Sequence, residues 1–273
     1  MPLEQEIIAN YLNHPLLPTA NILVFDELPS TNSYLLEIVK NNKSFPLACF
    51  TEFQSSGRGQ LGKRWYSANN SSICCSLSWG FKTAPPGNLS LAVAVMVANA
   101  LQAIGVSRKI TLKWPNDVLW KNQKLAGILI ENQIVDNQCF SIIGVGINLA
   151  VPKNIGYLID QPWCDLATIL SPLPNKNFIA SSLLNCLITG LTAYQASGFN
   201  AFADCWRALD HTKNLKITIT TALKKITGLA VGIDNLGNYL VKTGKHQVIS
   251  FSSGTISLIE SNSLSPLNLS KTL

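Results

Sequence analysis

Residues 110–134 read ITLKWPNDVLWKNQKLAGILIENQI, and the pattern of this stretch decides the strand architecture of the chain. Apolar residues at 110–114 indicate a strand, which ends in a turn at the residues PND, 115–117. Two further apolar segments, 118–120 and 125–134, flank the polar residues KNQK. Apolar segments joined by so short a polar connection predict a β-hairpin.

The segments on both sides of this hairpin predict further strands and helices. Residues 140–149, FSIIGVGINL, indicate a strand whose two glycines suggest close approach of backbone or of a ligand. A long apolar segment, 89–104, is expected to form a buried helix that begins after Asn88 and ends at Gly105. Other strands are expected at 22–28, 47–54 and 73–79, and other helices at 3–12, after 32, at 178–195 and at 199–209.

The pattern changes after residue 212. Short alternating segments such as LKITIT at 215–220 and YLVKTG at 239–244 are separated by Gly and Asn turns. Such a series is typical of a small barrel. We therefore predict a first domain at 1–212, a barrel domain at 213–263 and a flexible tail at 264–273.

Composition limits the class of protein. The 273 residues are 47% apolar, which is enough for a sizeable core, and the net charge is +6. Charged residues make up only 13%, without a block of Lys and Arg, so a dedicated nucleic-acid surface is not expected. A local basic site for phosphate explains the modest positive charge.

Cysteine and histidine usage indicates a reducing compartment and little thiol or histidine catalysis. The seven Cys show no C-x-x-C spacing, and the three His are His14, His211 and His246. The N-terminus, MPLEQEII, lacks the basic region of a signal peptide. The apolar segment at 89–104 is shorter than the roughly 20 residues of a membrane span, so a cytoplasmic protein is expected.

The stretch GRGQLGK, residues 57–63, satisfies two phosphate-loop patterns at once, G-x-G-x-x-G and G-x-x-x-x-G-K. Both patterns require a following helix, and the second requires Ser or Thr after the lysine. Arg64 occupies that position, and residues 65–72 are rich in turn formers. What remains is a glycine loop with three cations, Arg58, Lys63 and Arg64. Such a loop suits an anionic ligand, and it equally suits a basic surface turn.

Four segments together resemble one known family. They are STN at 30–32, TEFQSSGRGQLGKRW at 51–65, KWPNDVLWKNQKLAGILIE at 113–131 and IIGVGINLA at 142–150. Their order and spacing resemble the biotin–protein ligases, and the resemblance extends from about residue 22 to residue 259. Each motif alone is weak, whereas the set is specific.

The resemblance implies both a fold and a reaction. The fold is α+β: a mixed, largely antiparallel sheet with flanking helices, followed by a small SH3-like β-barrel. The reaction consumes ATP and biotin, with Mg²⁺, and gives biotinyl-5′-AMP and pyrophosphate. Biotin then passes to a lysine of the biotin carboxyl carrier domain of a carboxylase such as acetyl-CoA carboxylase. Members of the family are often homodimers, and a homodimer is a further expectation.

The resemblance also assigns site residues. The catalytic set is Arg58, Lys124, Lys113 and Asp117. The substrate-binding set is Ser30, Thr31, Asn32, Gln54, Arg58, Gly59, Gln60, Lys124, Gly127, Gly144 and Gly146. The nucleotide-binding set is Arg58, Lys63, Arg64, Trp65, Lys113, Asn116 and Asn148. Asp117 is in addition the candidate ligand of Mg²⁺ or the proton acceptor for the carrier lysine.

These assignments are chemically reasonable because the reaction brings two anions together. Arg58 can bridge the biotin carboxylate and the α-phosphate with its planar fork. Lys124, expected at the hairpin tip, reaches the same phosphate, and Lys113 adds charge on the β/γ side. Asn148 is expected either to read the adenine edge or to cap its strand. Loop 55–64 is expected to be mobile without ligand, because its cations then lack partners.

Two features separate this sequence from some relatives. Many relatives carry a second arginine in the loop where this chain has Gln60, so the adenylate is expected to be held less strongly. Some relatives are biotin-responsive repressors with an N-terminal DNA-binding domain, but only about 21 residues precede the first expected strand here. Specific DNA binding is therefore not expected. A lipoate or octanoate ligase of related fold is the remaining alternative.

Overall fold

A central seven-stranded sheet organises the larger part of the molecule. The computed structural model describes residues 1–12, 14–41, 46–244 and 247–259. The strands are β1 (Ile22–Leu28), β2 (Leu47–Gln54), β3 (Ser72–Phe81), β4 (Ile110–Lys113), β5 (Asp117–Trp120), β6 (Gln123–Val135) and β7 (Gln138–Asn148). Their order is β1-β2-β3-β7-β6-β5-β4, and only the β1–β2 pair is parallel. The mixed, largely antiparallel sheet is thus confirmed.

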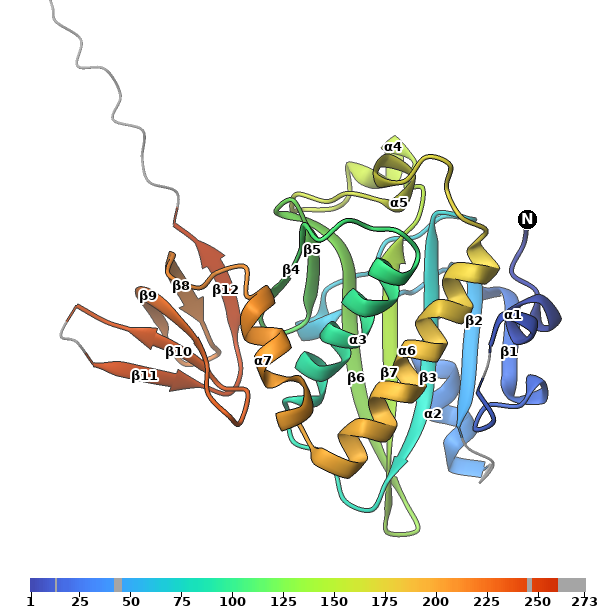
Figure 1. Cartoon of the computed structure of the whole chain (residues 1–273), viewed down its shortest axis with the longest axis horizontal. Helices are drawn as coiled ribbons and strands as arrows, with labels where there is room; N and C mark the ends of the chain where they lie inside the picture. Colours follow the sequence, from blue (N-terminus) through green and yellow to red (C-terminus); the bar gives the residue numbers. More distant parts are fainter. Residues whose placement is uncertain (13, 42–45, 245–246, 260–273) are drawn as a thin grey trace, which may run out of the picture.

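Helices cover the two faces of this sheet unequally (Figure 1). The helices are α1 (Gln5–Tyr11), α2 (Thr31–Asn41), α3 (Leu89–Ala103), α4 (Lys153–Gly156), α5 (Leu166–Ile169), α6 (Lys176–Ser197) and α7 (Asn200–Leu209), with 3₁₀ turns η1 (Thr19–Asn21) and η2 (Gln60–Gly62). The long helices α3 and α6 pack on one face together with α1 and α7, whereas α2 packs on the opposite face. The sheet therefore carries four of these helices on one face and α2 on the other.

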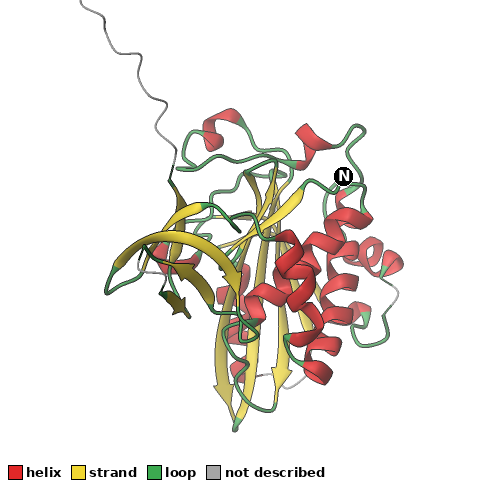
Figure 2. Ribbon diagram, turned by 60° about the vertical axis from the view of Figure 1, so that its left-hand side comes forward, coloured by secondary structure: helices red, strands yellow, loops and turns green. Residues whose placement is uncertain are grey.

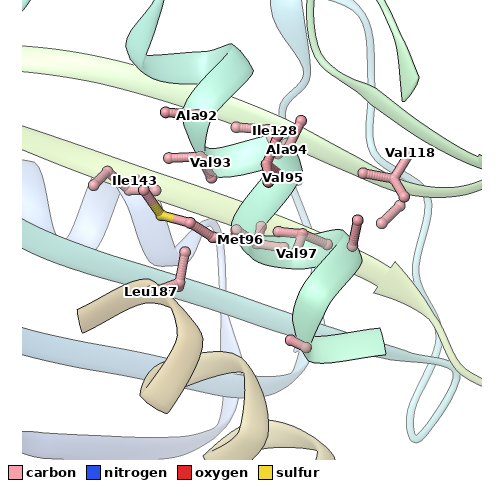
Figure 3. Close-up of a cluster of buried hydrophobic side chains, with 14 of the residues drawn as sticks. Ala92, Val93, Ala94, Val95, Met96, Val97, Val118, Ile128, Ile143 and Leu187 are labelled. Carbon is pink, nitrogen blue, oxygen red and sulfur yellow. The ribbon is translucent and has the colours of Figure 1, made fainter. Parts of the chain in front are cut away.

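The main core lies between the sheet and α3. Met96 of α3 lies between Ile143 of β7 and Leu187 of α6 (Figure 3). A side chain at Gly190 of α6 would come within 2.5 Å of Met96, so glycine is needed for the close approach of α3 and α6. Nearly every residue of α3 is buried. None of the helices in the described residues combines the length and the hydropathy that a membrane span requires.

The ends of α3 match the sequence prediction only in part. The helix begins after Asn88 and is followed by Gly105 at φ +100°, as predicted. Asn88, however, does not cap the helix with its side chain. Its amide donates to the Leu236 carbonyl at 3.1 Å, and its Oδ1 accepts from the Tyr194 hydroxyl at 2.6 Å. Asn88 thus ties α3 to the C-terminal part of the chain.

The C-terminal strands form a second, smaller antiparallel sheet. They are β8 (Lys216–Thr220), β9 (Lys225–Ile233), β10 (Tyr239–Lys242), β11 (Val248–Phe251) and β12 (Thr255–Leu258), in the order β11-β10-β9-β8-β12. The sheet is strongly curved (Figure 2). The division at residue 212 stays a prediction; it falls in the connection between α7 and β8. The predicted tail, 264–273, and the end of the predicted barrel, 260–263, lie outside the described residues.

Hydrogen bonds join the smaller sheet to the larger one and to the segment that connects them. The Trp114 indole donates to the Gly237 carbonyl at 3.2 Å. The Tyr239 hydroxyl lies 2.5 Å from Thr212 Oγ1, and Thr212 also donates through its backbone N–H to Asp210 at 2.9 Å. Burial raises the pKa of the Asp210 carboxyl, and hydrogen bonds from Thr212 and Tyr239 act against that rise. The smaller sheet is therefore held firmly against the larger one.

Candidate active site

A cavity of about 520 Å³ opens on the sheet face that the long helices leave free. Ile128 and Val145 pack in the core beneath α3, so their strand neighbours Gly127, Leu129 and Gly144 face the opposite side. The cavity lining includes every residue that the sequence assigned to the site: Ser30, Thr31, Asn32, Gln54, Arg58, Gly59, Gln60, Lys63, Arg64, Trp65, Lys113, Asn116, Asp117, Lys124, Gly127, Gly144, Gly146 and Asn148. Segments far apart in the chain thus meet at one place.

The STN segment at the start of α2 forms a buried polar network. The Thr31 backbone N–H donates to Gln54 Oε1 at 2.9 Å. The Ser76 hydroxyl of β3 lies 2.7 Å from Thr31 Oγ1 and 2.6 Å from Asn32 Oδ1. Sequence reasoning missed Ser76. The alternation of Ser and Cys along β3 predicts which face it occupies, but only the fold brings it to the STN segment.

Two of the predicted glycines are required by close contacts. A side chain at Gly144 would come within 2.3 Å of Asn32 Oδ1, and one at Gly146 within 2.6 Å of the Trp65 ring. Trp65 therefore lies flat against the glycine-lined strand β7. Its indole nitrogen is buried without a hydrogen-bond partner. The prediction that Trp65 stacks on adenine stays a prediction.

The glycine loop lacks the helix that a dinucleotide-binding loop or a P-loop requires. Only the short turn η2 follows Gly59, and no helix lies between Lys63 and the start of β3 at Ser72. The loop folds back on itself, since the Gly59 N–H donates to the Lys63 carbonyl at 2.7 Å. The prediction that no helix directly follows Lys63 is confirmed.

The expectation that the loop cations lack partners without ligand is wrong for Arg58 and Arg64. Arg58 donates from Nη1 and Nη2 to the two carboxylate oxygens of Glu131, at 2.9 and 2.8 Å. Arg64 donates to the Ser55 carbonyl at 3.0 Å, and its guanidinium lies 5.4 Å from the centre of the Tyr66 ring. Sequence reasoning did not identify Glu131 as the partner of Arg58, because the two residues lie 73 positions apart.

Lys124 and Asp117 form a half-buried ion pair inside the cavity. Lys124 Nζ lies 2.6 Å from Asp117 Oδ1, with 17% and 15% of the two side chains exposed. Lys124 is not at the hairpin tip as predicted. It lies on β6, because the turn has only two residues, Lys121 and Asn122, both with positive φ. This position directs Lys124 into the cavity.

Lys113 lies on β4 next to this pair. Burial lowers the pKa of its ammonium group, and the positive charges of Lys124 and Lys63 lower it further, while Asp117 acts in the opposite direction. Positive charge therefore outweighs negative charge at this end of the cavity. The arrangement favours an anionic ligand.

The amides of Asn148 and Asn116 hold backbone. Asn148 Nδ2 donates to the carbonyls of Lys124 and Cys164, at 3.2 and 3.0 Å. Asn116 Nδ2 donates to the Ile128 carbonyl at 2.8 Å. Both residues line the cavity, yet these N–H groups already have partners. Direct contact of Asn148 with adenine stays a prediction.

Two wall segments were missed by sequence reasoning. One is the segment after α4, with Leu158, Ile159, Asp160, Gln161 and Trp163. The other is β12, from which Thr255, Ile256 and Ser257 line the cavity. Neither segment carries a local motif, and both reach the site through tertiary packing. The smaller sheet therefore contributes to the same cavity.

Among the described residues, no histidine lines the cavity, and the two cysteines that line it, Cys74 and Cys75, are buried. All seven cysteines are free, and burial raises the pKa of Cys74, which lines the cavity, to about 12. His14 and His211 do not line the cavity, and His246 lies outside the described residues. Within the described part of the chain, no group of three or more His, Cys, Asp or Glu is placed to hold a metal ion.

Comparisons with known proteins agree with this geometry. Residues 24–148 match the model of the biotin/lipoate A/B protein ligase family, which defines the class of the larger domain. Residues 216–259 match the biotin protein ligase C-terminal domain, so the chain belongs to the biotin protein ligase family.

Several relatives are similar over most of their length. The bifunctional ligase/repressor BirA of Salmonella typhimurium is 31% identical, over 84% of this chain and 72% of that protein. The biotin--[acetyl-CoA-carboxylase] ligase of Mycobacterium tuberculosis is 30% identical, over 81% of this chain and 82% of that protein. The structure of the Aquifex aeolicus biotin protein ligase in complex with biotin and ATP shares the fold. Its TM-score is 0.73 at 24% identity, over 88% of this chain and 98% of that one.

Proposed function

We propose that this chain is an ATP-dependent biotin–[biotin carboxyl carrier protein] ligase. The observation that carries the proposal is the convergence of all four sequence motifs on one cationic cavity. In the first step a biotin carboxylate oxygen bonds to the α-phosphorus of ATP, and pyrophosphate leaves. In the second step the carrier lysine nitrogen bonds to the biotinyl carbonyl carbon, and AMP leaves with the bonding electron pair. The amine proton passes to a base.

The neutral end of the cavity suits the ureido ring of biotin. Thr31 and Gln54, with Ser30 beside them, offer hydroxyl and amide groups that pair with N–H and C=O groups. Gly144 and Gly146 make room for the Asn32 side chain and the Trp65 ring, and both of these side chains line the cavity. Asn32 acts mainly as a support, because its amide nitrogen donates to Leu129 and Glu131.

The cationic end suits the carboxylate and the phosphates. Arg58 and Lys124 neutralise charge on the α-phosphate as the oxygen attacks, and Lys113 binds the leaving pyrophosphate. Lys63, Arg64 and Asn116 complete the nucleotide side. Mg²⁺ usually binds through one or two carboxylates together with substrate phosphates. Asp117 fits this role, and Mg²⁺ would there offset charge on the leaving pyrophosphate.

The lowered pKa of Lys113 makes nucleotide binding sensitive to alkaline pH. The ammonium loses its proton at a lower pH than an ordinary lysine, whose pKa is 10.5. Affinity for ATP should therefore weaken as pH rises through that lowered value. Lys113→Arg stays charged and should retain its affinity over the same range, about pH 7 to 10.

Calorimetric titration of ATP at several pH values measures this effect. Lys121→Arg, on the exposed hairpin turn, controls for general effects of alkaline pH. Parallel affinity curves for wild type and Lys113→Arg would show that Lys113 does not hold the phosphates.

Gln60 limits how strongly the adenylate is retained. It lines the cavity as a neutral residue, and a charge-assisted hydrogen bond exceeds a neutral one by about 1 kcal/mol, roughly fivefold in dissociation. Gln60→Arg should therefore release the adenylate about fivefold more slowly than wild type. Rapid mixing with excess unlabelled adenylate measures the rate.

A matched control adds the same charge elsewhere. Gln102→Arg alters an exposed residue of α3 on the opposite side of the sheet and should leave the release rate unchanged. Equal rates for wild type and Gln60→Arg would mean that residue 60 does not face the phosphate.

The carrier step has a direct test. A biotin carboxyl carrier domain of acetyl-CoA carboxylase, incubated with the chain, biotin and ATP, should gain the mass of one biotinyl group. A carrier variant with Arg in place of its acceptor lysine should gain none. Labelling of both carriers to the same extent would contradict transfer to a specific lysine.

Three wider expectations stay predictions. They are a cytoplasmic location, formation of a homodimer, and lack of specific DNA binding. Sedimentation with and without biotin and ATP tests the second. Titration against a library of duplex DNA sequences, at stated salt, tests the third.

A further inference from the structure

Glu131 of β6 joins two parts of the site that are distant in sequence. Its carboxylate accepts two hydrogen bonds from Arg58 in the glycine loop, at 2.9 and 2.8 Å. The Oε2 atom also accepts from Asn32 Nδ2 of the STN segment at 2.9 Å. One side chain therefore connects the loop over the cavity to the buried polar network beneath it.

This pair differs from an ordinary surface ion pair. The Glu131 side chain is 25% exposed, whereas Glu37, which pairs with Lys40 on α2, is 68% exposed. Asn32, the third member, is only 4% exposed, and its other amide hydrogen bond goes to the Leu129 carbonyl. Arg58 binds both carboxylate oxygens of Glu131, and the buried Asn32 amide holds the same carboxylate. These hydrogen bonds restrict the rotation of both side chains, whereas a single exposed ion pair leaves them mobile.

The pair leaves Arg58 able to bind a ligand. A guanidinium carries five N–H groups in a fixed plane, and Glu131 accepts from only two of them. Arg58 lines the cavity, so its remaining N–H groups are available to an anion. Glu131 itself follows Gly127 and Leu129 on the same strand face, one step beyond the cavity wall. It therefore holds Arg58 from outside the space that a ligand would fill.

We propose that Glu131 is a positioning residue that fastens loop 55–64 across the cavity before substrate arrives. The effect on catalysis rests on the proposed function. The attachment of the loop to Glu131 does not, because it is present in the ligand-free chain. An arginine that is already fixed loses less conformational freedom when it binds the carboxylate and phosphate. Loss of Glu131 should free the loop and weaken retention of the adenylate.

Hydrogen exchange of the ligand-free full chain tests the fastening directly. Glu131→Gln keeps the shape of the side chain and removes its charge. Amides in 55–64 should exchange roughly three- to tenfold faster in this variant, the range expected for a partly exposed ion pair. Glu37→Gln makes the same chemical change in the α2 pair and should leave exchange in the loop unchanged.

A double variant separates fastening from a general loss of structure. If Glu131 acts on the loop through Arg58, Glu131→Gln should add nothing to the loop exchange of Arg58→Ala. Additive increases in the double variant, or wild-type exchange in Glu131→Gln, would overturn the proposal. Thermal unfolding of each variant shows whether the rest of the chain remains folded.

Adenylate release gives the functional readout. Glu131→Gln should release biotinyl-5′-AMP roughly three- to tenfold faster than wild type and Glu37→Gln. Unchanged release together with faster loop exchange would overturn the catalytic part of the proposal alone. Failure of wild type to form any adenylate would refute the proposed function and leave the exchange result standing.

Discussion

Replacing Lys124 by methionine should lower the rate of adenylate formation by about 10²- to 10³-fold, the usual effect of losing one preplaced charge donor. Lys124 is the cation that the turn geometry directs into the cavity, with Nζ 2.6 Å from Asp117 Oδ1. Methionine keeps most of the side-chain volume but removes the charge. The Asp117 carboxylate, only 15% exposed, is then left without its partner and repels the incoming anions.

Lys121→Met is the matched control for this change. Lys121 lies on the same hairpin, at the exposed two-residue turn, with its Nζ 4.4 Å from the centre of the Trp120 ring. The control should stay within about twofold of wild type, as is usual for exposed substitutions. Single-turnover formation of biotinyl-5′-AMP is the measurement. Equal rates for Lys124→Met and Lys121→Met would remove Lys124 from the catalytic set.

Replacing Trp206 by alanine should lower the free energy of unfolding by about 3 to 5 kcal/mol, the usual cost of truncating a buried tryptophan. Trp206 of α7 is 1% exposed, and its ring centre lies 6.5 Å from that of Tyr239 on β10. The indole thus packs in the core beneath the junction of the two sheets. Alanine would leave a cavity at that junction, which the surrounding strands cannot close.

Urea unfolding followed by circular dichroism measures the loss. Tyr157→Ala also truncates an aromatic side chain, but at a position that is 85% exposed, and should change stability by less than about 0.5 kcal/mol. A loss below about 1 kcal/mol for Trp206→Ala would contradict the tight packing of α7 against the smaller sheet.

Short apolar segments bounded by polar residues or Pro predicted the bounds of two strands correctly. The bounds of β1 and β2 agree with the expected 22–28 and 47–54. The position of the hairpin is confirmed, but its turn is shorter than the predicted four residues KNQK. Positive φ at Lys121 and Asn122 closes the turn in two residues, and the sequence KN carries only a weak signal for that geometry.

Contacts between distant segments could not be predicted in the same way. The glycine loop motif identified Arg58, but its partner Glu131 lies 73 residues away at the end of the apolar segment LAGILI. Ser76 and the cavity-lining residues of β12 are likewise ordinary in their local sequence. A sequence motif identifies residues that lie in one loop or turn. The contacts of Glu131, Ser76 and β12 depend instead on the order of the strands and on the packing of the second sheet.

Biotin-dependent exchange of labelled pyrophosphate into ATP tests the central claim most directly. The purified chain with Mg²⁺ should catalyse exchange when biotin is present and should not do so without it. Lipoate and octanoate should support little exchange, and Lys124→Met should abolish most of the biotin-dependent signal. Equal exchange with lipoate or octanoate, or none with biotin, would contradict the assignment of this cavity to biotin adenylation.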